Sequence, residues 1–260
     1  MRLFSAFCDK TIDFENHYVT HSGIENKQTK KQTGNIMINL EDFNELVMAR
    51  RSMRSFLSTP VPDIDIKRIL ETAQYAPSNC NTQPWKVCVV SGKKSTEIQQ
   101  ALLESIGVGE FQLDYPFDDS LYKGAHKERQ VGAAKAYMQA ADVAREDTEG
   151  RNGFMKRNLS FYNAPHAAFI FMPDWCGVRE ASDVGMYAQN LLLAMRAHNV
   201  GSCPQTILGF NADAVRKVLD IPDNMKLLFG VSFGYFDAEH PLNTVRTERA
   251  NIKDSVSFYS

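Results

Sequence analysis

Apolar residues recur along this chain with two spacings, one typical of helices and one typical of buried strands. Leu40, Phe43, Leu46 and Val47 follow helical spacing and predict a helix that runs directly into residues 50–54. Apolar runs bounded by Gly, Pro or Ser predict strands. We therefore expect strands at 85–90, 167–172 and 227–235, helices over 95–106 and 184–197, and further helices that start after Pro62 and Asn211.

Individual residues indicate where these elements begin, end and face. Asp63 is expected to cap the second helix, which should end before Pro77 because the residue preceding a proline is pushed out of the helical region. Asn211 is expected to cap the last helix. Residues 184–197 are apolar around most of the helix circumference, which predicts a helix buried centrally or at a subunit interface. The tail over 245–259 alternates near its end and is expected to add an edge strand.

Two segments fall outside this regular pattern. Residues 1–38 are polar and mixed, which predicts a poorly ordered N-terminal extension ahead of one domain over 39–260. Residues 107–157 are too long for a simple connection and predict a semi-independent excursion. Within the excursion, an Ala-rich helix should reach about Arg145, followed by a polar turn over 146–153.

Composition narrows the class of protein. A chain of 260 residues with 43% hydrophobic content suits one large domain with a sizeable core. The formal net charge of −2 gives no reason to expect nucleic acid or an anionic membrane surface as a partner. The five cysteines (positions 8, 80, 88, 176 and 203) include no C-x-x-C pair, which argues against a disulfide framework or a Cys-rich metal site. The six histidines show no H-x-x-x-H spacing, so we expect no metal site. The first ten residues make a poor signal peptide, and we expect a cytoplasmic protein.

Three guanidinium groups and a hydroxyl lie within five residues, at Arg50, Arg51, Ser52 and Arg54. On a continuous helix Ser52 would point away, so all four converge only if the helix ends near Arg51 and the chain turns. A helix C-terminus is the wrong end of the dipole for a phosphate, so the attraction would come from the guanidinium groups themselves. The alternative interpretation is a solvated basic face.

Residues 77–83 place amide and hydroxyl side chains on a short loop that begins and ends next to prolines. Asn and Gln amides carry both donors and acceptors, so they match the polar edge of a flavin ring, and Pro77 and Trp85 are near enough to cover its face. A turn rich in turn-forming residues is the alternative. Together with the arginines, the loop suits a ligand with a phosphate at one end and a flat ring at the other, such as FMN.

These segments also carry a resemblance to a known family. Ala49-Arg-Arg-Ser-Met-Arg-Ser-Phe56, followed by Ala76-Pro-Ser-x-x-Asn-x-Gln-Pro-Trp85, resembles the opening of the nitroreductase family of FMN flavoproteins. Asn163-Ala-Pro-His, Ser202-Cys-Pro-Gln-Thr and Arg246-Thr-Glu-Arg249 resemble later family segments, so the likeness spans roughly residues 40–258. Within the excursion, Tyr115-Pro116 and the basic stretch 126–129 are similar to the nitrobenzoate-reductase-like branch.

The resemblance implies roles for particular residues. In the family, the first segment grips the FMN phosphate and ribityl chain, the Pro-Ser loop reaches the flavin of the partner subunit, and the Cys-Pro-Gln-Thr loop lies along the ring. A late arginine returns to the phosphate, with Arg249 as the best match and Arg246 as the second choice. The implied cofactor-binding residues are Arg50, Arg51, Ser52, Arg54, Pro77, Ser78, Asn79, Asn81, Pro204, Gln205, Thr206 and Arg249. No acid–base or nucleophilic residue is implied.

The resemblance further implies an α+β fold, with a mixed central sheet wrapped by helices, in an intertwined homodimer. It implies an NAD(P)H-dependent nitroreductase with bound FMN, in which hydride passes from NAD(P)H through the flavin to a nitroaromatic acceptor by a ping-pong mechanism. Quinones are a further candidate class of acceptor. Flavin-dependent reductive dehalogenation and a non-enzymatic flavin-binding redox sensor are the alternatives.

Two further expectations concern the surroundings of the flavin. Residues 107–157 are expected to cover the acceptor site, so exchanging them should change acceptor preference and leave FMN bound. Cys80 and Cys203 would both lie near the flavin, and we interpret them as small half-buried residues rather than as a redox-active pair.

Overall fold

A computed structural model of the chain describes residues 39–107, 109 and 111–260. The prediction of a poorly ordered extension over residues 1–38 lies outside these described residues. Residues 39–260 form one compact unit.

A four-stranded antiparallel sheet forms the centre of this unit, with strand order β1-β2-β4-β3. Its strands are β1 (Lys86–Ser91), β2 (His166–Pro173), β3 (Gly201–Gln205) and β4 (Met225–Gly234). The sheet was expected to be mixed, but all its strand pairs are antiparallel; an isolated parallel bridge joins Ser52 to Ser202 of β3 at one edge. β3 was not predicted from the sequence, because its residues Gly-Ser-Cys-Pro-Gln form no apolar run; pairing with β4 makes this segment a strand.

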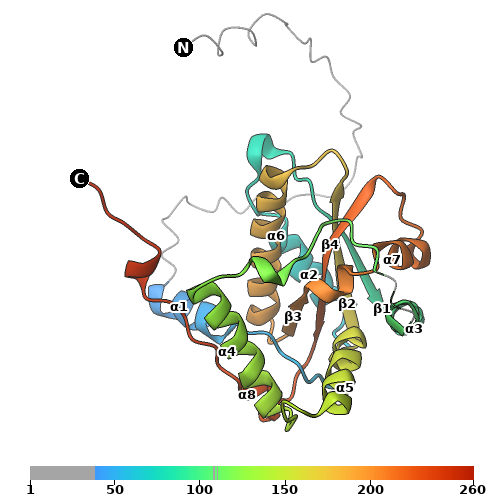
Figure 1. Ribbon diagram of the computed structural model, residues 1–260. Helices are drawn as coiled ribbons and strands as arrows, with labels where there is room; N and C mark the ends of the chain where they lie inside the picture. The colour runs from blue at the N-terminus through green and yellow to red at the C-terminus, as the bar shows by residue number, and fades with distance from the viewer. Residues whose placement is uncertain (1–38, 108, 110) are drawn as a thin grey trace, which may run out of the picture. The chain divides into compact units, whose positions relative to one another are not determined.

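Helices cover both faces of the sheet (Figure 1). Their bounds are α1 (Leu40–Ala49), α2 (Asp63–Ala73), α3 (Gly92–Gly107), α4 (Ala125–Ala140), α5 (Thr148–Leu159), α6 (Val178–Ala197), α7 (Ala212–Leu219) and α8 (Pro241–Thr244). Short 3₁₀ turns connect some of them, including η1 (Asn79–Asn81), η3 (Phe161–Asn163) and η5 (Ile252–Asp254). None of the helices in the described part of the chain is both long and apolar enough to span a membrane.

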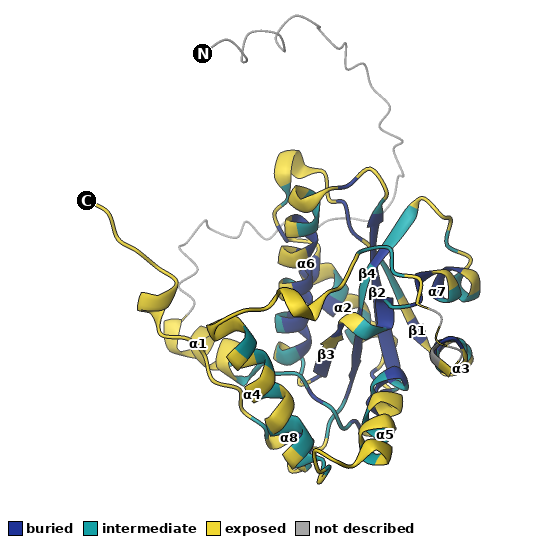
Figure 2. Cartoon of the chain, viewed as in Figure 1, coloured by how far each residue is buried: buried dark blue, intermediate teal, exposed yellow. Residues whose placement is uncertain are grey.

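β2 supplies side chains to two hydrophobic clusters, one on each face of the sheet. Ala168, Ile170 and Met172 pack with α2 and α6, whereas the alternate residues pack with α3, α5 and α7. Successive strand residues point to opposite faces, so a strand covered on both sides needs an uninterrupted apolar run. Figure 2 shows β2 as buried along most of its length.

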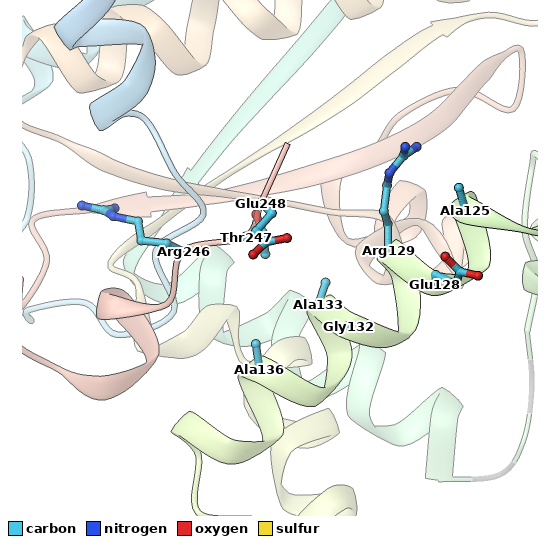
Figure 3. Close-up of a pocket in the computed structure, with 9 residues that line it drawn as sticks. All are labelled: Ala125, Glu128, Arg129, Gly132, Ala133, Ala136, Arg246, Thr247 and Glu248. Atoms are coloured by element: carbon cyan, nitrogen blue, oxygen red, sulfur yellow. The ribbon is translucent and has the colours of Figure 1, made fainter. Parts of the chain in front are cut away.

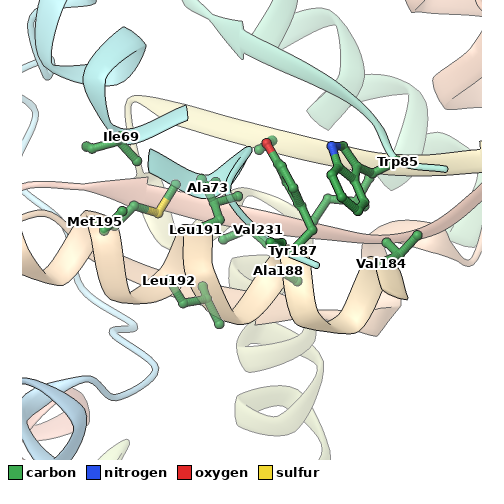
Figure 4. Packing of buried hydrophobic residues seen from close by; sticks show 14 of the residues in the cluster. Ile69, Ala73, Trp85, Val184, Tyr187, Ala188, Leu191, Leu192, Met195 and Val231 are labelled. Atoms are coloured by element: carbon green, nitrogen blue, oxygen red, sulfur yellow. The ribbon is translucent and has the colours of Figure 1, made fainter. Parts of the chain in front are cut away.

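The first cluster gathers around α6, the helix predicted to be buried (Figure 4). Trp85 stacks on Tyr187 of α6 with ring centroids 4.9 Å apart. An aromatic pair of this kind adds about 0.5–1.5 kcal/mol to the stabilisation that comes from burial alone. The predicted helix over 184–197 is confirmed and begins six residues earlier, at Val178.

Three predicted details differ from the structure, and a fourth is confirmed. Asp63 does not cap α2: the N-cap is Pro62, and no side chain accepts a hydrogen bond there. α4 ends at Ala140 rather than near Arg145. Most of the predicted turn over 146–153 lies in α5, which Asp147 starts by accepting a hydrogen bond from Gly150 N. The predicted cap at Asn211 is confirmed by its 3.1 Å hydrogen bond from Ala214 N.

Two predictions about strands also need correction. β1 was expected to be buried, yet it is an edge strand on which only Val90 is fully buried, because no further strand covers its outer side. The tail over 245–259, predicted to add an edge strand, pairs with no strand in the described part of the chain, and its one regular element is η5. Its last aromatic residues, Phe258 and Tyr259, are 89% and 94% exposed.

Candidate functional site

Residues 50–54, the arginine segment, follow α1 and run beside the sheet. α1 ends at Ala49, and Arg50 has an extended backbone (φ −67°, ψ 120°). Met53 N then donates a 2.9 Å hydrogen bond to Ser202 O of β3. The arginine side chains could converge only if the helix ended near Arg51, and α1 ends just before that residue. The segment then runs along the edge strand β3.

A buried asparagine ties this segment to the C-terminal part of the chain. Asn243, in α8, is completely buried. Its side-chain oxygen accepts a 2.6 Å hydrogen bond from Arg54 N, and its amide donates to Ser55 O (2.8 Å) and Asp237 O (2.7 Å). Sequence reasoning missed Asn243, since an isolated Asn in a polar stretch gives no signal that it is buried.

The arginines carry charge that the described residues do not neutralise. Arg50, Arg51, Arg54 and Arg249 form no ion pair among the described residues. Burial, and next the positive charge of Arg249, lower the pKa of Arg50, so these two residues from opposite ends of the described chain lie close together. The Nε atom of Arg51 is buried without a hydrogen-bond partner. Arg50 is half-buried and Arg249 is exposed. Neighbouring cations that repel each other, next to an unpartnered guanidinium donor, form a site suited to a polyvalent anion such as a phosphate.

The late arginines differ in their surroundings. Arg249 donates only to nearby groups, with Nη1 lying 2.9 Å from Thr247 Oγ1. Arg246 lies at the edge of a pocket of about 500 Å³ between α4 and the tail, and its side chain extends away from α4 (Figure 3). Arg249 is also the late arginine whose positive charge acts on Arg50.

The end of β3 lies next to the arginine segment and offers a partly exposed surface. Pro204 and Thr206 are exposed, whereas Gln205 is buried. The Gln205 amide donates to Asn158 O (2.7 Å) and Oδ1 (2.6 Å) and accepts from Ser232 Oγ. The side chain of Gln205 is thus fully used inside the protein, so only its backbone remains for a ligand.

The loop over 77–83 is held by two side chains that accept backbone hydrogen bonds. Asn79 N donates to Asp183 Oδ2 (3.0 Å), and Gln83 N donates to Ser78 Oγ (3.0 Å). Within the loop Cys80, Asn81 and Gln83 have positive φ angles of 50°, 56° and 45°. Left-handed backbone at non-Gly residues costs about 1–3 kcal/mol each and concentrates at functional sites. The side chains of Asn79 and Asn81 remain exposed.

Within one chain, this loop and the arginines are far apart. The loop is anchored to Asp183 near the start of α6, whereas the arginine segment pairs with Ser202, just beyond the end of that helix. At 1.5 Å per residue, the helix from Asp183 to its end spans about 20 Å. In Figure 1 the cyan turn around residue 80 lies at the upper end of α6, whereas α1 lies beside the lower half of that helix. The structure therefore brings the arginines, β3 and the tail together, but not the 77–83 loop.

The same separation decides how the two cysteines are interpreted. Cys80 is exposed in the distant loop, while Cys203 is buried in β3. They cannot form a redox pair within one chain. Burial also raises the pKa of the Cys203 thiol, which keeps this side chain neutral and unreactive.

Comparison with known proteins gives consistent results. The model of the Nitroreductase family matches residues 47–235. Nitroreductase NfnB of Mycolicibacterium smegmatis is 40% identical over 213 residues, covering 82% of this chain and 91% of that protein. A 4-nitrobenzoate reductase of a Nocardioides species is 31% identical over 224 residues, covering 84% and 90%. The crystal structure of the FMN-dependent NfnB from Mycobacterium smegmatis, in complex with NADPH, superposes with a TM-score of 0.82 at 39% identity, covering 85% of this chain and 99% of that one.

Proposed function

The chain belongs to the nitroreductase family, and on that premise we propose that it is an FMN-dependent oxidoreductase that uses NAD(P)H to reduce nitroaromatic compounds. Quinones are a further candidate class of acceptor. The named activities of the relatives favour this function over reductive dehalogenation and over a redox sensor. The four scattered free cysteines of the described chain are compatible with the reducing, cytoplasmic setting that we also propose.

One observation carries the proposal: guanidinium groups from both ends of the described chain gather, and no carboxylate of the described residues pairs with them. Such a cluster is costly unless an anion occupies it. The terminal phosphate of FMN is dianionic and can accept bidentate hydrogen bonds from several guanidinium groups at once. FMN also has a flat ring, and the exposed end of β3 runs alongside the arginine segment where such a ring could lie.

The residues take the following roles in this proposal. Arg50, Arg51, Arg54 and Arg249 bind the phosphate and the ribityl chain, and Ser52 adds a hydroxyl. Pro204 and Thr206 line the ring, with Gln205 contributing only its backbone because its amide is occupied. Bound FMN would supply the two-electron chemistry that links the nicotinamide to the acceptor. The protein's contribution is to bind and orient, so no side chain is assigned to proton transfer or nucleophilic attack.

We also propose that a second copy of the chain completes the site with its 77–83 loop, through Pro77, Ser78, Asn79 and Asn81. The separation of that loop from the arginines along α6 supports a shared site. Unpaired apolar surface supports the dimer: on α1, Leu40, Phe43 and Met48 are 68%, 46% and 74% exposed. Isolated exposed apolar residues are ordinary, but a helix that presents several on its surface is typical of an interface.

Complementation between two variants tests the shared site. Chains that carry Arg50→Ala and chains that carry Asn79→Ala with Asn81→Ala would each bind FMN weakly. In a mixed dimer, one of the two sites would receive intact arginines from one chain and an intact loop from the other. Mixing should therefore restore FMN binding. If the loop served the arginines of its own chain, mixing would restore nothing.

The visible spectrum of the purified protein tests the function itself. We expect a yellow protein that oxidises NAD(P)H when nitrobenzoate is present, measured in parallel with a quinone and a halotyrosine. Turnover with the halotyrosine alone would favour a dehalogenase, and no turnover with any acceptor would favour a sensor. A colourless protein that takes up no added FMN would contradict the whole proposal.

Replacement of a single phosphate arginine tests the assignment of residues. Arg50→Ala or Arg249→Ala should weaken FMN binding about tenfold or more, because each removes a charge-assisted hydrogen bond worth about 1.5–3 kcal/mol. Arg145→Ala is the matched control, since Arg145 is exposed. Arg216 is unsuitable as a control because it is buried and paired with Asp114 and Asp213. Equal FMN affinity in the site variants and the control would contradict the assignment.

A further inference from the structure

The guanidinium group of Arg54 lies over an aromatic ring from a distant part of the chain. Its central carbon is 3.7 Å from the ring centroid of Tyr137, which belongs to α4 in the excursion. The ring of Tyr162 lies 5.9 Å away. Both rings fall within the range in which a cation is attracted to an aromatic face. Arg54 is thus held by two residues, one in the middle of the excursion and one just after it.

Tyr162 is set in place by an unusual backbone. Phe161, Tyr162 and Asn163 have positive φ angles of 59°, 52° and 63° in succession, which is sterically unfavourable for residues with side chains. Tyr162 is nevertheless buried, at 3% exposure, and its ring packs against Phe154. Burial raises the pKa of Tyr162 to about 12, so it faces Arg54 as a neutral phenol. The surrounding packing therefore imposes this turn, and one result is a fixed aromatic group beside Arg54.

The contacts of Arg54 leave most of its hydrogen-bond donors free. Nη1 of Arg54 donates a hydrogen bond to Ser52 O at 3.4 Å, and the guanidinium also forms a side-chain hydrogen bond with Tyr162. Stacking uses the flat face of a guanidinium, whereas hydrogen bonds leave from its edge. Tyr137 is also close enough to Arg50 to act on its charge. The Tyr137 ring therefore lies among the arginines and orients Arg54, while the N–H donors at the edge of that guanidinium remain available to a ligand.

We infer that Tyr137 is a positioning residue for the phosphate-binding arginines, and that α4 of the excursion is for this reason part of the cofactor site. The inference rests on the proposed function, since it assumes that Arg54 faces a flavin phosphate. It changes one expectation from the sequence. Replacing residues 107–157 should not leave FMN binding intact, because the exchange removes the ring that holds Arg54. Acceptor preference and cofactor retention are thereby linked through a single helix.

Titration of the full-length protein, freed of flavin, with FMN and with riboflavin tests this inference. Riboflavin has the same ring and ribityl chain but no phosphate. In Tyr137→Leu we expect the Kd for FMN to rise about tenfold, which corresponds to the energy of a partly desolvated cation–π contact. The Kd for riboflavin should change less than about twofold. Tyr137→Phe keeps the ring and should stay within about threefold of the wild type for FMN.

Controls separate a role at the phosphate from damage to the fold. Tyr122→Leu alters another tyrosine of the excursion, 43% exposed, and should bind both flavins like the wild type. In an Arg54→Ala background, Tyr137→Leu should add little further loss of FMN affinity, because the partner of the ring is gone. Unchanged FMN affinity in Tyr137→Leu, equal weakening of FMN and riboflavin, or additive effects with Arg54→Ala would each overturn the inference. A wild-type protein that does not prefer FMN to riboflavin would instead overturn the proposed phosphate site.

Discussion

The replacement Asn243→Ala is expected to destabilise the folded protein and to loosen the cofactor site together. Asn243 is completely buried, and its side chain makes three hydrogen bonds, of 2.6, 2.8 and 2.7 Å, with Arg54 N, Ser55 O and Asp237 O. A buried intramolecular hydrogen bond contributes about 1 kcal/mol net, and a buried group left without a partner costs at least as much. The free energy of unfolding should therefore fall by about 3 kcal/mol. For a domain of this size, that corresponds to a fall in Tm of roughly 6–12 °C.

Urea denaturation followed by circular dichroism measures this loss, with wild type and variant at the same protein concentration. Thr244→Ala is the matched control on the same helix, because the Thr244 hydroxyl makes one 2.9 Å hydrogen bond to Pro241 O at an exposed position. That control should lose no more than about 0.5 kcal/mol. FMN affinity should fall in Asn243→Ala but not in the control, since only Asn243 holds the backbone of Arg54. A loss below 1 kcal/mol in Asn243→Ala, or the same loss in both variants, would refute the reasoning.

Two further replacements probe buried charge and pH dependence. Asp114→Asn should lower the free energy of unfolding, measured by urea denaturation, by about 2–3 kcal/mol because it weakens a buried ion pair with Arg216. Asp213→Asn should lower it by less than about 1 kcal/mol because the Asp213 side chain is 56% exposed. Equal losses in the two variants would contradict this contrast. Burial lowers the pKa of His166 below its ordinary value of 6.5, so the unfolded chain binds a proton more readily than the folded one. The contribution of His166 should be complete above about pH 6.5 and should be lost as the pH falls towards the lowered pKa. His166→Gln can still accept the hydrogen bond from Val61 N, so its stability should vary less between pH 7.5 and 5.5, and an unchanged pH dependence would exclude His166 as the cause.

Some features of this protein follow from short-range sequence pattern. Helical spacing over residues 40–47 predicted α1, and the apolar run at 167–172 predicted β2. Both predictions work because the spacing of apolar residues follows the repeat of the helix or strand that buries them. The arginine segment was also recognisable, since three guanidinium groups in five residues are a local property. Even the end of α1 at Ala49 could be anticipated from what convergence of the arginine side chains requires.

Other features depend on partners that the local sequence does not reveal. β3 is a strand only because β4 pairs with it, and its Gly-Ser-Cys-Pro-Gln sequence has no strand pattern of its own. Arg216 is buried because Asp114, from the excursion, pairs with it there, and the residues around Arg216 in the sequence do not reveal this partner. The resemblance implied that the loop containing Gln205 lies along the ring, and only the structure shows that Asn158 and Ser232 occupy the Gln205 amide.

Local sequence is enough to identify the residue types that can bind a phosphate and a flat polar ring, and the order of most elements that carry them. Which of those residues meet depends on how the elements pack. Asn243 fixes the start of the C-terminal tail to the backbone of Arg54, and Arg249 of that tail then lies near Arg50. Asp183 holds the 77–83 loop at the other end of α6. The physical reason is that periodicity records the burial of each residue along its own element, whereas proximity between distant residues comes from packing and hydrogen bonds between elements.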